Sequence, residues 1–214
     1  MRIGSLISLT AAIGLVAVGA PGLPTGQAKA ASFNCAEAAS KTEIAICADP
    51  NLSQLDSAVG LYYAQRLALD ASLRQIQRGW LKARDIGCGR DRDCLRRFMT
   101  AEIGWLRGGD PPSALPRSVG VCALTTISRR GSRLQGDPGS GSAIEEANGA
   151  MQISYDQIPQ IDASRRGDPV MVCLASVPRD CPPGDDRGKV YAVANLRTLG
   201  AWAQPDSEHG CGGA

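Results

Sequence analysis

The only histidine of the chain, His209, stands two residues before Cys211 in a glycine-rich tail. A histidine beside a thiolate could support nucleophilic catalysis, and the same pair joined by Cys173 or Cys181 could hold a zinc ion. Both arrangements need reduced thiols, whereas a disulfide-bonded Cys211 cannot act as a nucleophile. We therefore interpret His209 as a surface residue and predict neither a catalytic nor a metal site here.

Carboxylates gather at two other places. Asp180, Asp185 and Asp186 flank a Pro-Pro-Gly segment and could offer oxygen ligands to calcium. They lack the regular alternation of an EF-hand loop, and a tight turn explains them more simply. Glu145-Glu146 could supply one acid for glycoside hydrolysis, but that chemistry needs a second carboxylate at a fixed separation. The sequence locates none, so an edge-strand charge pair is the preferred interpretation.

The glycine-rich run 136–142 lacks the Gly-Lys-Ser/Thr of a phosphate loop, and we expect a flexible loop there. With no catalytic set, no metal ligands and no cofactor motif, the sequence predicts a protein that acts by binding and is not an enzyme. A hydrolase whose carboxylates converge only in the folded chain is a less favoured alternative.

Residues 1–30 have the features of a signal peptide. Arg2 precedes an apolar run from Ile3 to Ala20, and Ala28-Lys29-Ala30 offers a small-x-small cleavage site. An uncleaved membrane anchor is the alternative, because the apolar run approaches the length that spans a bilayer. We expect a periplasmic or secreted protein that is not stably inserted in the membrane once the signal is removed.

All the cysteines lie beyond this segment, and an even number in an exported chain indicates a disulfide framework. They are Cys35, Cys47, Cys88, Cys94, Cys122, Cys173, Cys181 and Cys211. Without Arg2 and Lys29 the chain has 21 basic and 21 acidic residues. A neutral chain lacks the basic excess typical of nucleic-acid or anionic-membrane surfaces.

Apolar residues recur at helical spacing between Leu52 and Leu106, and capping signals precede them at Ser40 with Glu43 and at Asp49-Pro50. We predict a disulfide-stapled four-helix unit over residues 31–107. The same stretch contains a set of spaced motifs that combine four cysteines, a tryptophan and an Arg-Asp pair. The motifs are Phe33-x-Cys35, Glu43-x-x-Ile46-Cys47, Leu52-x-x-Leu55-Asp56, Tyr62, Gln77-x-x-Trp80-x-x-x-Arg84-Asp85-x-x-Cys88 and Cys94-Leu95.

This pattern resembles that of LprI-type lysozyme-inhibitor domains, from which the chain departs at Met99 and Glu102, where the family usually has Tyr and Arg. The resemblance implies a lysozyme or another muramidase as partner. The signature residues are interpreted as structural: Phe33, Glu43, Asp56, Tyr62, Trp80, Arg84 and Asp85. The charged turn Gly89–Asp93 is a weak candidate for contact with the partner; a solvated turn is the simpler interpretation.

Four cysteines in the helical unit permit three pairings, and the sequence does not choose among them. Cys35–Cys88 with Cys47–Cys94 is slightly favoured, because a Cys88–Cys94 bridge would staple only its own turn.

Residues 108–118 form a Pro/Gly linker, and the period then changes from helical to alternating. Strands are expected around residues 119–126, 151–155, 170–174 and 190–193, with turns at 129–131, 136–142, 148–149 and 182–188. Asn148-Gly149 is a strong hairpin signal. The expected fold class is α+β in two domains, the helical unit followed by a disulfide-stapled all-β barrel or sandwich over 119–214. An envelope-associated structural or ligand-binding module is the alternative to the inhibitor.

Overall fold

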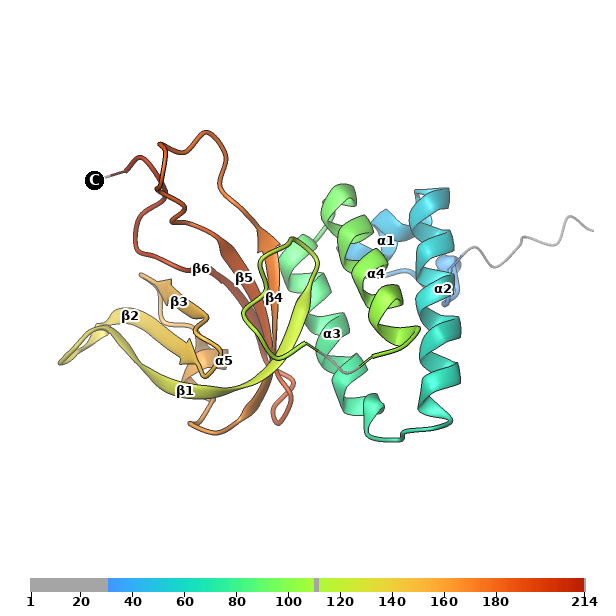
Figure 1. The fold of residues 1–214 in the computed structure, drawn as a ribbon, viewed down its shortest axis with the longest axis horizontal. Coiled ribbons are helices and arrows are strands. Elements are labelled where there is room, and N and C mark those ends of the chain that lie inside the picture. Colours follow the sequence, from blue (N-terminus) through green and yellow to red (C-terminus); the bar gives the residue numbers. More distant parts are fainter. Residues whose placement is uncertain (1–30, 110–111, 214) are drawn as a thin grey trace, which may run out of the picture.

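The computed structural model describes residues 31–109 and 112–213, so the expected signal peptide and two linker residues lie outside the described part. Four α-helices come first, followed by six strands and one short helix (Figure 1). In chain order the elements are η1 (Cys35–Glu37), α1 (Lys41–Cys47), α2 (Pro50–Leu67), α3 (Leu73–Cys88), α4 (Arg92–Leu106), β1 (Cys122–Leu134), β2 (Asp137–Glu146), β3 (Met151–Ser154), α5 (Pro159–Asp162), β4 (Pro169–Ser176), β5 (Val190–Asn195) and β6 (Ala201–Pro205). The α+β class is confirmed.

The predicted helix starts are confirmed in detail. Ser40 and Glu43 form a reciprocal capping box at the start of α1. Asp49 caps α2, accepting hydrogen bonds from two backbone N–H groups, and Pro50 occupies the first turn. Asp91 caps α4 in the same way. These caps fix where the chain turns, and α2, α4 and α3 then lie side by side, with α3 nearest the sheet (Figure 1).

The slightly favoured cysteine pairing in the helical unit is wrong. Cys35 bonds to Cys47, and Cys88 bonds to Cys94. The 3₁₀ turn η1 folds back onto the short α1, which brings Cys35 next to the end of that helix rather than to the far corner of the α2–α3 hairpin. The Cys88–Cys94 bridge does staple its own turn, the one that separates α3 from α4. In the second half Cys122 bonds to Cys173 and Cys181 to Cys211.

The second half forms an open antiparallel sheet with the strand order β3-β2-β1-β4-β5-β6. Asn148-Gly149 makes the predicted β2–β3 hairpin, with Gly149 at φ +88°. The turn expected at 129–131 is wrong, because those residues lie in β1. The turn expected at 136–142 is found only at its first residue: the β1–β2 ribbon turns at Gln135-Gly136, where Gly136 has φ +84°, and residues 137–142 belong to β2. The serines and glycines of 137–142 are typical of loops, so the composition of this run does not predict a strand.

Strand β4 is buried on both faces, which explains its continuous apolar run. Met171, Cys173 and Ala175 belong to the hydrophobic cluster of the helices, whereas Val170 and Val172 face a second cluster on the other side of the sheet. The helical unit and the sheet therefore share one core cluster. The division into two domains remains a prediction, but the two halves are packed directly on each other.

Small residues set the distance between α3 and the sheet. Gly79, Ala83 and Gly87 follow one another at intervals of four along the buried face of α3. A Cβ added at Gly87 would lie 2.7 Å from the Cβ of Ala192 and 3.1 Å from that of Ala175. The helix backbone thus approaches the strands more closely than larger side chains would allow.

Candidate functional site

Two of the signature residues form a buried ion pair between α2 and α3. Arg84 Nη1 donates to Asp56 Oδ1 across 3.3 Å, and both side chains are 5% exposed. The other oxygen of Asp56 accepts from the backbone N–H of Ser32 at 2.8 Å and from its hydroxyl at 2.5 Å. Arg84 Nε also donates to Asp85 Oδ1 at 2.9 Å. Both charged groups of the buried pair therefore have partners within the protein, which favours a structural role.

The remaining signature residues lie in or against the helical core or at a helix cap. Trp80 is fully buried, with the Arg84 guanidinium 5.2 Å from its ring centroid. Glu43 completes the capping box of α1, and the backbone N–H groups of Ser40 and Ala39 lower the pKa of its carboxyl. Phe33 and Tyr62 are half-buried against the helical core. These positions are compatible with a structural role for the signature residues.

The turn between α3 and α4 presents charged side chains to solvent. The Cys88–Cys94 bridge closes it, and the Thr42 hydroxyl donates to the Gly89 carbonyl at 2.9 Å. Asp91 is engaged as the α4 cap, whereas the side chains of Arg90 and Arg92 are exposed. Arg92 lies 3.9 Å from Asp49, and Arg90 has no ion-pair partner among the described residues. The turn is therefore held at its base and offers a free guanidinium at its tip.

Comparison of the chain with models of known protein families gives a match. Residues 34–130 match the family model of the lysozyme inhibitor LprI. This part of the chain is therefore similar to LprI-type domains. No curated protein and no solved structure matches the chain significantly. The LprI match runs past the predicted linker and into β1, up to Arg130, so it includes the strand that pairs with β4 at the centre of the sheet.

The two positions at which this LprI-type domain departs from the expected pattern are both buried in α4. Met99 is fully buried in the helical core, and Glu102 is 4% exposed. Burial raises the pKa of Glu102 to about 8, against the opposing attraction of Arg66 and Arg84. Oε1 of Glu102 has no hydrogen-bond partner in the described part of the chain. A carboxyl group in such surroundings is held largely in its neutral form near pH 7.

Glu102 lines a cavity of about 300 Å³ between α4 and the first strand. The wall is otherwise almost entirely apolar or backbone and comprises Ala101, Trp105, Gly108, Pro112, Gly120, Val121, Cys122, Ala123, Leu124 and Met171. The indole Nε1 of Trp105 is also buried without a partner among the described residues. Sequence reasoning missed this site, although one signal was present. Phe98, Glu102 and Leu106 are spaced by four on one helix face, which puts a carboxylate in an apolar stripe.

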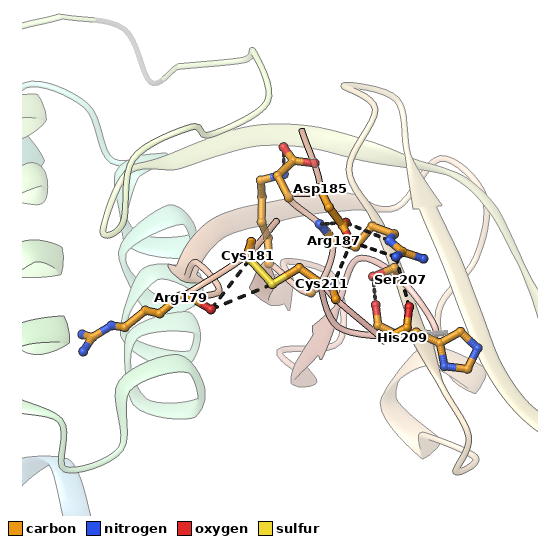
Figure 2. Close-up of a disulfide and its surroundings, with 12 residues drawn as sticks. Arg179, Cys181, Asp185, Arg187, Ser207, His209 and Cys211 are labelled. Atoms are coloured by element: carbon orange, nitrogen blue, oxygen red, sulfur yellow. Dashed lines mark hydrogen bonds and ion pairs between the residues drawn. A yellow bond between two sulfur atoms is a disulfide. The ribbon is translucent and has the colours of Figure 1, made fainter. Parts of the chain in front are cut away.

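The residues of the C-terminal tail serve as structural pieces (Figure 2). Cys211 is bonded to Cys181, as expected for a cysteine that cannot be a nucleophile. Arg187 grips both carboxylate oxygens of Asp185 at 2.9 and 2.8 Å, which holds the pKa of Asp185 well below its usual range. His209 is exposed, and its ring points away from the disulfide (Figure 2). Asp186 pairs with Lys189.

The two adjacent glutamates of β2 have different surroundings. Glu145 pairs with Arg129 across the β1–β2 ribbon. Glu146 is buried, and its Oε2 accepts from Gln152 Nε2 at 3.4 Å, while Gln152 Oε1 accepts from the Trp202 indole at 3.1 Å. Burial raises the pKa of Glu146 to about 8. This polar chain joins β2, β3 and β6 across the inner face of the sheet, where β3 and β6 come together without pairing as strands.

Two further features bear on function. Within residues 31–109 and 112–213 there is no helix that is long and apolar enough to cross a membrane. The same residues contain no group of three or more histidine, cysteine, aspartate or glutamate side chains arranged to hold a metal ion.

Proposed function

We propose that this protein is exported and inhibits a lysozyme-type muramidase by binding, without catalysis of its own. The observation that carries the proposal is the match of residues 34–130 to the lysozyme inhibitor LprI. The disulfide framework supports export, since bridges of this kind persist in oxidising compartments. The signature residues supply the scaffold, so the contact with a muramidase is assigned to the exposed surface that this scaffold presents.

The turn Gly89–Asp93 is the favoured contact. A muramidase of this type works through two carboxylates in a cleft, and a guanidinium is the side chain that pairs best with a carboxylate. Arg90 is exposed and unpaired at the tip of a turn that the Cys88–Cys94 bridge closes. Because the turn is already held in place, little conformational entropy is lost when it enters a cleft.

The test is a turbidity assay in which bacterial cell walls are lysed by several lysozyme types in the presence of the oxidised protein. We expect stoichiometric slowing of lysis by at least one type. Arg90→Glu should weaken inhibition tenfold or more, because a reversed charge repels the cleft carboxylates. Arg78→Glu is the matched control, since Arg78 is exposed on α3, lacks an ion-pair partner among the described residues and changes the net charge equally.

If no lysozyme type is slowed by a molar excess of the oxidised protein, the inhibitor proposal is wrong and an envelope-associated binding module becomes the better description. If Arg90→Glu and Arg78→Glu both inhibit as well as the parent, the inhibitory surface lies away from the turn.

A further inference from the structure

The cavity beside α4 has the features of a binding site for a small molecule. We propose that it binds a small uncharged amphiphile with an alkyl or aromatic body and a single hydroxyl head, held between Glu102 and Trp105. This goes beyond muramidase inhibition and does not depend on it, because the cavity lies between α4 and β1 whereas the proposed inhibitory turn precedes α4.

Size and lining define the body of the ligand. The volume of about 300 Å³ is roughly twice that of the ~150 Å³ apolar cavity that takes up benzene in an engineered protein. Ala101, Val121, Leu124, Met171 and Gly120 are among the residues that line the cavity. Such a lining favours an apolar body of about the size of a short alkyl chain or a substituted ring.

Two buried polar atoms define the head. Glu102 and Trp105 are three residues apart on α4, which places them next to each other on one helix face. Oε1 of Glu102 and Nε1 of Trp105 both lack hydrogen-bond partners among the described residues. Leaving such groups unsatisfied costs about 1–3 kcal/mol each. A ligand or solvent molecule in the cavity is the natural way to recover that free energy.

The chemistry of the two atoms selects a hydroxyl group. The indole N–H can only donate, so the head must accept a hydrogen bond from Trp105. Above its raised pKa of about 8 the Glu102 carboxylate can only accept, so there the head must donate to it. A hydroxyl does both with one atom. Arg66 contributes to the rigidity of this arrangement: its guanidinium lies 5.4 Å from the Trp105 ring centroid, and its Nη1 donates to the Trp105 carbonyl at 2.9 Å.

A pair of isomers tests the proposal directly. n-Heptanol and hexyl methyl ether have the same composition, but only the alcohol can donate a hydrogen bond. The chain has three tryptophans, so the indole N–H signals of the ¹⁵N-labelled oxidised protein can be followed individually by NMR. We expect n-heptanol to shift the Trp105 signal saturably and to leave those of Trp80 and Trp202 in place. Above pH 8, where the Glu102 carboxylate can only accept, the ether should bind about tenfold more weakly, which corresponds to one lost hydrogen bond.

Three variants complete the test. Glu102→Leu should remove the preference for the alcohol, and Ala101→Phe should fill the cavity and abolish binding of both isomers. Glu146→Leu is the matched control, because it removes the other buried glutamate, which does not line the cavity, and the preference should survive. Equal binding of the two isomers to the parent protein would overturn the proposal. So would an unmoved Trp105 signal in saturated n-heptanol, since water alone then fills the cavity.

Discussion

Arg84 and Asp56 meet in the interior of the helical unit, 3.3 Å apart, and Asp56 extends the contact to the backbone and hydroxyl of Ser32. The pair therefore connects three segments: α2, α3 and the extended residues that precede η1. Two charges taken out of water in this way are stable only while both are present.

Removal of one partner should accordingly be costly. We expect Arg84→Ala to lower the free energy of unfolding by about 3–5 kcal/mol, because it leaves the Asp56 carboxylate buried and unpaired. Arg96→Ala breaks an exposed pair with Asp93 on α4 and should change stability by less than about 1 kcal/mol. Urea denaturation followed by circular dichroism measures both. Equal losses in the two variants would contradict a role for the buried pair.

The two buried glutamates should make the protein less stable as pH rises. The pKa of Glu102 and that of Glu146 are each raised from 4.5 to about 8 by burial. Between these two pKa values the folded chain holds protons that the unfolded chain releases. The resulting contribution to the free energy of unfolding is complete below the unfolded-state pKa of 4.5 and is lost as the pH rises towards 8. We expect Tm to fall between about pH 5 and pH 8. The double variant Glu102→Gln, Glu146→Gln should flatten this slope; an unchanged slope would rule out these two groups as its cause.

The close contact between α3 and the sheet should not tolerate an added methyl group. We expect Gly87→Ala to destabilise the chain by about 1–3 kcal/mol, because its Cβ would meet Ala192 and Ala175, whose own Cβ atoms are fixed to buried strands. Gly104→Ala is the control. It lies within α4 with open space around it, and should stabilise the chain by about 0.5–1 kcal/mol. Chemical denaturation midpoints decide, and a stabilising Gly87→Ala would disprove the contact.

The bridge that spans the longest stretch of chain should matter most. Cys122 and Cys173 are 51 residues apart and lie directly opposite each other on β1 and β4, whereas Cys88 and Cys94 are only 6 apart. Loop-closure entropy predicts losses of about 4 and about 2 kcal/mol when each pair is replaced by alanine. Thermal melting of the two double variants under identical conditions shows which variant loses more stability. The reverse order would show that local packing outweighs chain entropy here.

Local signals in the sequence predicted local structure well. The caps at Ser40 and Asp49 and the Asn148-Gly149 hairpin follow from interactions within a few residues, and each was found where expected. The cysteine pairing failed because it depends on how η1 folds back onto α1, which no spacing rule encodes. Strand β6 was not expected, since Ala201 and Ala203 give little alternation around the buried Trp202.

The cavity illustrates a different limit. A glutamate in an apolar stripe can be recognised from sequence, but its meaning depends on what faces it. Here the facing wall comes from the start of β1 and from Met171 of β4, residues remote in sequence from α4. The departure at Glu102 from the LprI pattern was visible at once, whereas the cavity that surrounds it required the fold.

The four disulfides share a property that concerns biogenesis. Each joins a cysteine to the very next cysteine along the chain: first with second, third with fourth, fifth with sixth and seventh with eighth. On the proposed export route the polypeptide emerges from its N-terminus, so every cysteine meets its correct partner before any later competitor has crossed the membrane. Vectorial oxidation then yields the native set directly. On that route we expect a thiol oxidase to be sufficient for maturation, without a disulfide isomerase.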